Sequence, residues 1–489
     1  MAFDFEHEDL QKSILECFFE TVIMMKTNKK FQKALFIFRR DLRIEDNTGL
    51  VFALEHAQEV ILCFIFSPEQ IEHNPYRSDH CLQFMIESLE DLEKEIINKG
   101  GRLYLFYEKP ENVVAELIKK QHVDAVVVNR DYTPYSIKRD QKIDATCKKL
   151  GASFCSFDDA LLHLPDQTLK GDGKPYTVFT PFYRNAMRLE VKLPVTHRYK
   201  NYYSDSIPLA AGSSLFKTIL PKRVLPPSGG RTAALKILEK LEQFSYYESL
   251  RDFPSEQGTT HLSAHLKFTT CSPREVYWMI SRQFGASSAL IRSLYWRDFF
   301  TSIGFYFPQV FSGAFHAKFD RLQWSHDEQM FRKWCEGKTG FPIVDAGMRE
   351  MNQTGFMHNR VRMIAASFLV KDLHIDWRWG ERYFAQTLID YDPAVNNGNW
   401  QWAASTGCDA QPYFRIFNPW TQAKKFDPNC LYIKKWIPEL ASLPSEIIHK
   451  WHQEKHQSQC PSYPIPIVDH AKEFKTALSL YTEVQRIDR

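Results

Sequence analysis

ALFIF, residues 34–38, is the first of five short apolar segments that decide the fold of the first third of the chain. The others are VILCFIF (60–66), RLYLFY (102–107), DAVVV (124–128) and ASFCSF (152–157). Segments with helical spacing separate them; the clearest runs from Leu82 to Ile96, before Gly100 and Gly101 end it. Alternating strands and helices predict an α/β domain with a doubly wound parallel sheet over residues 34–165. Neither GxGxxG nor GxxxxGK[ST] occurs there, so nucleotide sites of those two kinds are not expected.

The second half of the chain follows a helical period instead. Apolar residues recur with helical spacing in ALKILEKLEQF, REVYWMISRQF, WRDFFTSIGFYF, GMREMNQ and RMIAASFLVKDL, and all 11 tryptophans lie in this half. We therefore predict an all-α domain over residues 232–489. Residues 166–231 are expected to form an interdomain linker, because turn formers dominate the later part and no period is sustained. Residues 1–33 are expected to form an amphipathic helical extension.

Length and composition are those of a globular protein with several domains. The chain has 489 residues, of which 44% are apolar and 25% charged, and its net charge is +3. That mild charge does not demand a polyanionic partner, although clustered Lys and Arg on one surface would be enough to bind one. The 10 cysteines form no CxxC pair, which argues against a zinc ribbon or a disulfide framework and favours reduced thiols. We expect no metal site, no membrane span and a cytoplasmic monomer.

A second stretch, 390-DYDPAVNNGNWQW-402, combines side chains that few structural roles require together. Its acids accept hydrogen bonds, its asparagines both donate and accept, and its tryptophans offer flat, polarisable faces. Such a stretch is typical of the wall of a site for an aromatic, hydrogen-bonding ligand. The residues leave one alternative open, which is a turn at Pro393 and Asn397-Gly398 with the tryptophans buried in the core.

Two further motifs place polar side chains beside predicted helices. In EQGTTHLSAHL (256–266), hydroxyls and free backbone amides precede a helix, where they can cap the helix or hold a phosphate. In MHNRVRMIAASF (357–368), Arg362 is expected to pair with Asp390 or Asp392, because a buried arginine needs a carboxylate. Arg360, two positions earlier, is then expected to point elsewhere, outward from that helix.

Four ordered motifs are long enough to compare with known families: FIFRRDLRIEDN (36–47), EGKTGFPIVDAGMREMNQTGFMHNRVRM (336–363), DYDPAVNNGNWQWAASTG (390–407) and YFRIFNPWTQAKKFDP (413–428). Together they resemble the photolyase and cryptochrome flavoproteins, most closely the class I cyclobutane pyrimidine dimer photolyases. The resemblance runs from about Lys33 to about Val484. It implies a DNA-repair lyase in which photoexcited, reduced FAD passes an electron to a dimer flipped out of UV-damaged DNA.

The resemblance also implies where FAD binds. The diphosphate contacts would be Tyr247, Thr259, Thr260, His261, Leu262 and Ser263. The flavin and ribityl contacts would be Arg297, Asn359, Arg362, Asp390, Tyr391 and Asp392. Asn396 is similar to the residue that faces flavin nitrogen 5, where an amide can stabilise either a protonated or an anionic flavin. Trp400, Trp377 and Trp324 are similar to the family's relay of three tryptophans, which carries electrons from the surface to an oxidised flavin.

The lesion side of the site follows from the same resemblance. Trp296 and Trp402 resemble the aromatic clamp on which a flipped dimer stacks. Other contacts to the lesion or the DNA backbone would be Arg251, Ser293, Asn359, Arg360, Met363, Arg415, Gln422 and Lys424. Ser293 departs from the family, because class I photolyases usually carry a glutamate there that hydrogen-bonds the dimer. Thr133 stands where folate-binding members carry a glutamate, so a second, antenna chromophore remains open among a folate, a deazaflavin, another flavin or none.

Two other functions occur among the proteins that the chain resembles. A cryptochrome would signal in blue light without repair, but signalling members tend to carry Cys or Asp at the position of Asn396. A (6-4) photolyase would carry a second histidine after His358, and here Met363 occupies that place. Repair of cyclobutane dimers is therefore the prediction, with these two functions as alternatives.

Overall fold

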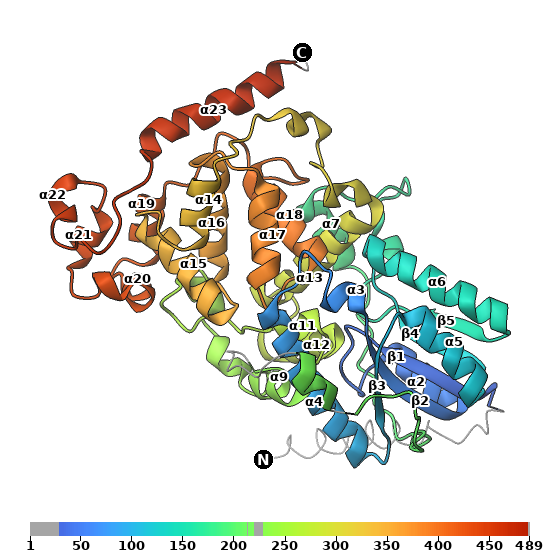
Figure 1. Ribbon diagram of the computed structural model, residues 1–489. Coiled ribbons are helices and arrows are strands. Elements are labelled where there is room, and N and C mark those ends of the chain that lie inside the picture. Colours follow the sequence, from blue (N-terminus) through green and yellow to red (C-terminus); the bar gives the residue numbers. More distant parts are fainter. Residues whose placement is uncertain (1–28, 213, 220–227, 488–489) are drawn as a thin grey trace, which may run out of the picture.

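A five-stranded parallel sheet forms the N-terminal domain. In the computed structural model, which describes residues 29–212, 214–219 and 228–487, the strand order is β3-β2-β1-β4-β5 (Figure 1). The strands are β1 Phe31–Phe38, β2 Ala57–Phe66, β3 Leu103–Tyr107, β4 Ala125–Asn129 and β5 Ser153–Phe157. The predicted sheet is confirmed, and every neighbouring pair of strands is parallel. Residues 1–28 of the predicted N-terminal extension lie outside the described residues. The extension was predicted to end at residue 33, but β1 already begins at Phe31.

Helices cover both faces of this sheet, because side chains along a buried strand alternate between the faces. The helices of this domain are α2 Thr48–His56, α3 Pro68–Ile71, α4 Asp79–Asn98, α5 Pro110–Gln121 and α6 Pro134–Leu150. Leu35 and Ile37 of β1 pack with α5 and α6. Phe36 and Phe38 point to the opposite face, where they join the core formed with α2 and α4. The helix predicted around residues 82–96 is α4.

The second half of the chain is helical, as predicted. Its helices are α9 Arg231–Leu238, α10 Tyr247–Leu250, α11 Ser263–Lys267, α12 Pro273–Phe284, α13 Ala289–Tyr306, α14 Glu328–Cys335, α15 Pro342–Thr354, α16 Asn359–Lys371, α17 Trp377–Thr387, α18 Pro393–Ala404, α19 Pro419–Phe426, α20 Leu431–Trp436, α21 Ser445–His449, α22 Glu454–Gln457 and α23 His470–Ile487. Short 3-10 helices are η1 Pro165–Thr168, η2 Leu241–Phe244, η3 Pro308–Phe311, η4 Ala317–Arg321 and η5 Pro438–Leu440. The largest apolar core of this half gathers the buried tryptophans Trp334, Trp377, Trp400 and Trp451.

The segment expected to be a linker contains helices that pack against the rest of the protein. These are α7 (Phe179–Ala186) and α8 (Ser214–Ile219). Phe179 and Phe182 of α7 are buried in the apolar cluster around α13. Tyr202 forms an isolated bridge with Val60 of β2. Local periodicity did not reveal these contacts, because the burial of this segment depends on partners far away in the sequence.

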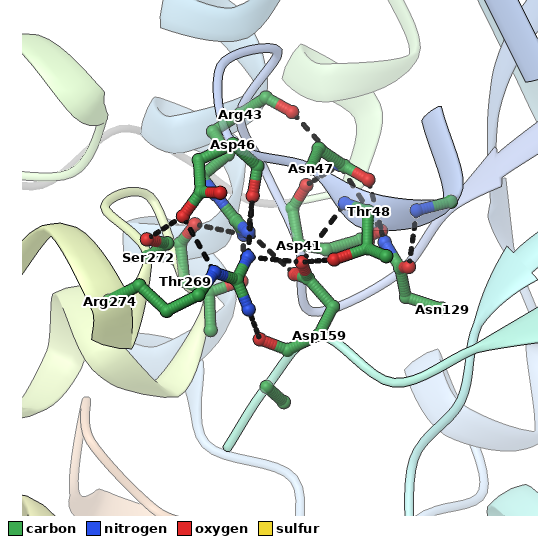
Figure 2. A network of polar contacts seen from close by, with 12 residues as sticks. Asp41, Arg43, Asp46, Asn47, Thr48, Asn129, Asp159, Thr269, Ser272 and Arg274 are labelled. Carbon is green, nitrogen blue, oxygen red and sulfur yellow. Dashed lines mark hydrogen bonds and ion pairs between the residues drawn. The ribbon is translucent and has the colours of Figure 1, made fainter. Parts of the chain in front are cut away.

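A buried ionic network joins the two domains (Figure 2). Arg274, at the start of α12, donates to Asp46 Oδ2 at 2.9 Å and to Asp159 Oδ1 at 2.8 Å, both in the N-terminal domain. Arg43 donates to the other oxygen of Asp159 at 2.6 Å and, across the boundary, to the Thr269 hydroxyl at 2.8 Å. Burial would raise the pKa of Asp159, but the charges of Arg43 and Arg274 hold that pKa well below its usual range.

Replacing Arg274 by Met should weaken the whole protein. The substitution leaves the buried Asp46 carboxylate without its ion pair and Asp159 with only one of its two, and breaking a buried pair typically costs about 3–5 kcal/mol. Denaturant unfolding followed by tryptophan fluorescence measures the loss, since every tryptophan lies in the helical half. The control is Lys148→Met, which removes an exposed pair with Asp144 and should cost less than about 1 kcal/mol. Equal losses for the two variants would contradict the role given to this network.

Candidate active site

Asp390 joins three segments that lie far apart in the sequence. Its Oδ2 accepts hydrogen bonds from Arg362 Nη2 of α16 at 2.9 Å and from Ser263 Oγ of α11 at 2.7 Å. Of the two carboxylates predicted for Arg362, the structure therefore selects Asp390. The other oxygen, Oδ1, is buried and has no hydrogen-bond partner among the described residues. A donor from a bound ligand would satisfy it, as a buried acceptor requires.

Asp392 begins α18 and binds the N-terminal domain. Its Oδ1 caps the helix by accepting two backbone N–H groups of the first turn, at 3.0 and 3.1 Å. Its Oδ2 pairs with Arg40, which follows β1 and also pairs with Asp131 at 3.2 Å. Burial would raise the pKa of Asp392, but the charge of Arg40 above all holds that pKa well below its usual range. Sequence reasoning missed Arg40 because its partner lies 352 residues away.

The stretch 390–402 is a short loop followed by a helix, so the alternative of a turn at Asn397-Gly398 is wrong. Pro393 occupies the first turn of α18, where its missing N–H costs no hydrogen bond. Gly398 lies inside α18, where Phe300 of α13 comes so close that an added Cβ would lie 2.1 Å from a ring carbon. Close approach of two helices explains this glycine.

Asn396 faces α17 and binds a glutamate that the sequence did not single out. Its Nδ2 donates to Glu381 Oε1 at 3.0 Å and to the Glu381 backbone oxygen at 3.1 Å. Glu381 is only 7% exposed, and burial raises its pKa to about 7. Both amide hydrogens of Asn396 are thus engaged, and Oδ1 is the atom that can accept a hydrogen bond from a ligand. The only sequence signal was the helical spacing of Glu381 from Trp377.

The hydroxyl-rich segment predicted to bind phosphate precedes α11. No side chain caps that helix, which begins after Leu262, so the capping interpretation is not supported. Thr259 Oγ1 lies 3.4 Å from His261 Nε2, and the Thr260 hydroxyl accepts the Leu262 N–H at 3.4 Å. The structure also brings the Tyr247 hydroxyl to within 3.4 Å of Ser293 Oγ, which joins a predicted phosphate contact to a predicted lesion contact.

His358, at the N-cap of the helix that carries Arg362, provides a second buried atom without a partner among the described residues. Its Nδ1 accepts the Arg360 N–H at 3.2 Å and so caps α16, which places the ring proton on Nε2. That nitrogen is buried and has no partner in the described part of the chain. Burial lowers the pKa of His358 to about 4, so the ring is neutral at physiological pH. An unpaired acceptor and an unpaired donor thus fit a bound polar group.

The two predicted clamp tryptophans are partly exposed. Trp296 lies on α13 and Trp402 on α18, and these helices are in contact. Asn359 is exposed at the start of α16, and its Nδ2 lies 3.8 Å from the sulfur of Met363. The predicted lesion contacts therefore come from three neighbouring helices.

Charged side chains predicted to contact DNA differ in their exposure. Arg251, Arg415 and Lys424 are exposed, and Gln422 is half-buried. Arg360 pairs with Asp252 at 2.9 Å and so has a different partner from Arg362, as predicted. Its side chain is only 16% exposed, against 24% for Arg362, so the expectation that Arg360 points outward is wrong. Contact between Arg360 and DNA stays a prediction that would require this ion pair to open.

Two predicted flavin contacts have other partners. Arg297 donates to the backbone oxygens of Ala160 and Leu266, so its guanidinium binds the domain boundary. Tyr391 stacks its ring on Tyr76 of the N-terminal domain, with centroids 6.2 Å apart and planes at 4°. Their contact with FAD stays a prediction.

The exposure of the three tryptophans of the predicted relay increases outward, as expected for a path that leads to the surface. Trp400 and Trp377 are each 2% exposed, and Trp324 is half-buried and packs against the same core. Trp400 lies on Gly380, one helical turn after Trp377, where an added Cβ would lie 2.2 Å from its ring. Ser325 bridges to Ile375 and so places Trp324 near the start of α17.

A small cavity of about 20 Å³, room for about one water molecule, lies between the two domains. Arg40, Asp131 and Thr133 line it from the N-terminal domain, and Arg297 and Thr301 line it from α13. Across the described ranges, no three His, Cys, Asp or Glu side chains gather as metal ligands would. No described helix combines the length and the apolar character needed to cross a bilayer.

Comparisons with known proteins identify the family. A family model described as the FAD binding domain of DNA photolyase matches residues 290–483, and one described as DNA photolyase matches residues 34–197. The deoxyribodipyrimidine photo-lyase of Alkalihalophilus pseudofirmus is 39% identical over 466 residues, which cover 91% of this chain and 96% of that protein. An archaeal photolyase from Sulfolobus tokodaii, solved with two FAD molecules, is 42% identical with a TM-score of 0.84, covering 92% of this chain and 100% of that one. A cryptochrome of Synechocystis is 26% identical, with a TM-score of 0.83 and coverage of 92% and 99%.

Glu381 should make the stability of the protein depend on pH. Because its pKa is about 7 in the folded state and 4.5 in the unfolded chain, ionisation is more costly in the folded state. Its contribution is complete below pH 4.5 and should fall by about 3 kcal/mol as the pH rises to about 7. Unfolding free energies of the wild type and Glu381→Gln, compared across this range, measure the change. Exposed Glu256→Gln controls for the loss of one carboxylate, and a pH-independent difference for Glu381→Gln would contradict the expectation.

Proposed function

The chain belongs to the DNA photolyase family, and we propose that it binds FAD and uses light to split cyclobutane pyrimidine dimers in UV-damaged DNA. The segment from Asp390 to Trp402 carries the proposal, because one loop and one helix present two acids, an oriented amide and a partly exposed tryptophan. The activity is the one after which the Alkalihalophilus relative is named. Of the alternatives, a cryptochrome is not favoured, since the Synechocystis cryptochrome is more distant, at 26% identity.

When bound, FAD supplies the light-excited electron that opens the dimer ring and takes the electron back, so the protein is left with binding and positioning. Asp390, fixed by Arg362 and Ser263, would accept a hydrogen bond at Oδ1, its unpaired oxygen. His358 would donate from Nε2. Asn396 would accept through Oδ1, because Glu381 holds its amide hydrogens on the other side. This set supplies acceptors and a donor for a cofactor with both kinds of group.

The lesion would bind between Trp296 and Trp402. A dimer inside a duplex cannot reach a buried cofactor, so it must be flipped out, and its weakened pairing and stacking lower that cost. The aromatic faces would then replace the stacking that the lesion loses, which is worth about 1–3 kcal/mol per base. Ser293 lacks the reach of the usual glutamate, but the Tyr247 hydroxyl lies 3.4 Å away and adds a second group that can donate to a dimer carbonyl.

Trp400, Trp377 and Trp324 would return an oxidised cofactor to its active state. Trp400 and Trp377 are buried in the core, whereas Trp324 is half-buried and has access to solvent, so an external reductant can return an electron to Trp324. Electrons would therefore move inward along the order Trp324, Trp377 and Trp400.

A second chromophore is also part of the proposal, and its identity stays open. The Sulfolobus photolyase, which this chain resembles over most of its length, was solved with two FAD molecules, and this supports a second chromophore here. The absorption spectrum of chromophores released from the purified protein would distinguish a folate, a deazaflavin and a flavin. We further propose that the protein acts as a monomer in the cytoplasm.

The reduced protein should repair a dimer-containing oligonucleotide under blue light and leave it unchanged in the dark. Trp296→Ala and Trp402→Ala should each weaken binding of that oligonucleotide about tenfold or more, because each removes a stacking face. Trp278→Ala removes a half-buried tryptophan of α12 and serves as control. Repair is followed by the return of thymine absorbance, and binding without light-dependent repair would refute the proposal in favour of signalling.

Replacing Trp400 by Phe should block photoreduction of the oxidised cofactor while leaving repair by chemically reduced protein intact. The relay is interrupted at its innermost member, whereas the lesion site is untouched. The decay of oxidised flavin absorbance under blue light with an added thiol measures the effect. Trp379→Phe is the matched control, because Trp379 lies on the same helix as Trp377 but packs on Phe331. Unchanged photoreduction in Trp400→Phe would disprove the relay.

A further inference from the structure

Phe179, at the start of α7, lies directly behind the clamp tryptophan of α13. The rings of Phe179 and Trp296 are stacked, with centroids 3.6 Å apart and planes at 6°. Phe179 is 1% exposed, whereas Trp296 is partly exposed. Phe179 therefore covers part of one face of the Trp296 ring. The rings of Phe299 and Phe300 also pack on Trp296, with centroids at 5.8 and 5.5 Å, so only the part of the ring that stays exposed can meet a ligand. Figure 1 shows α7 beside α13, and the two helices are in contact.

The same residue is tied to the other wall of the site. The backbone N–H of Phe179 donates to Asp409 Oδ2 at 3.0 Å, although 230 residues separate the two. Val178, at the N-cap position of α7, offers no side-chain hydrogen bond, so Asp409 serves as cap for the helix. Asp409 has a left-handed φ of 48°, which a non-glycine residue adopts at a cost, and this contact helps to hold it there.

Asp409 belongs to the loop that leaves the helix of Trp402. The Gln411 N–H of that loop donates to the Trp402 backbone oxygen at 3.2 Å. Cys408 is buried in the same apolar cluster as Phe179 and α13. One residue of α7 thus contacts Trp296 through its ring and, through its amide, the loop anchored on Trp402.

We propose that Phe179 and Asp409 are positioning residues that fix the orientation of Trp296 and its spacing from Trp402, and so set the preference for a dimer over normal DNA. This inference rests on the proposed function, in which the two tryptophans receive the lesion. Parallel stacking on Phe179 restricts the orientation of the Trp296 ring, whereas an apolar contact without a flat face would allow the ring to rotate. A pre-oriented wall binds more tightly because less side-chain freedom is lost on binding.

Phe182 supplies a matched control within the same helix. It is 2% exposed in the same apolar cluster, and its ring meets Phe299 at 5.3 Å. Phe179→Leu and Phe182→Leu each remove one phenyl ring from the same core, so a general loss of packing affects both variants. Only Phe179→Leu removes the stacked face behind Trp296.

The first test is the ratio of the dissociation constants for undamaged and dimer-containing oligonucleotides. Phe179→Leu should lower this ratio about tenfold, and Phe182→Leu should leave it within about twofold of wild type. Asp409→Ala should also lower it, and Asp409→Asn, which keeps an acceptor oxygen, should restore it. In a Trp296→Ala background, Phe179→Leu should change nothing further. Equal ratios for the two Leu variants, or an undiminished effect without Trp296, would overturn the proposal.

A second measurement does not depend on DNA. In protein labelled with 5-fluorotryptophan, the fluorine signal of Trp296 is identified by its loss in Trp296→Phe. That signal should shift and broaden in Phe179→Leu and stay in place in Phe182→Leu. An unchanged signal in Phe179→Leu would overturn the positioning role. If the wild type does not distinguish dimer-containing DNA but the signal does move, the proposed function fails and the positioning of Trp296 by Phe179 stands.

Discussion

The contact on which the rest of the structure depends is the buried carboxylate of Asp159 between two arginines from different domains. A buried charge is tolerated only where it is paired, so neither domain can slide without exposing or orphaning one of these groups. Arg43 comes from the loop after β1 and Arg274 from α12, and each binds one oxygen of the same carboxylate. These ion pairs thereby hold the loop after β1 against the helical domain.

That fixed loop carries a second ion pair, which reaches into the candidate active site. Arg40 precedes Arg43 by three residues and pairs with Asp392, the residue that caps α18. The helix that holds Asn396, Trp400 and Trp402 therefore begins at a position set by the N-terminal domain. The N-terminal domain thus fixes the start of the helix that forms one wall of the candidate active site.

Residue spacing and sequence motifs predicted those parts of the structure that depend on residues close together in the sequence. Strand alternation gave the sheet, helical spacing gave α4, α12, α13 and α16, and the pairing of Arg362 with a neighbouring carboxylate followed from the cost of burying a guanidinium. Residues whose role depends on a distant partner were missed. Glu381 looks like any polar residue of α17, and Phe179 lies in a segment expected to be a linker. Their significance appears only when folding brings Asn396 and Trp296 beside them.

The helical form of the segment after Asp392 explains how so few residues can face several groups. Asn396 and Trp400 lie four positions apart and share the face toward α17, where they meet Glu381 and Gly380. Asn397 and Gln401 repeat the same spacing one residue later, and both donate to the Val310 oxygen at 3.0 Å, which holds α18 against η3. Trp402 is two positions beyond Trp400, a rotation of about 200°, and so points to another side of α18. A turn at Asn397-Gly398 would break this period, so the arrangement of these side chains around α18 requires the helix.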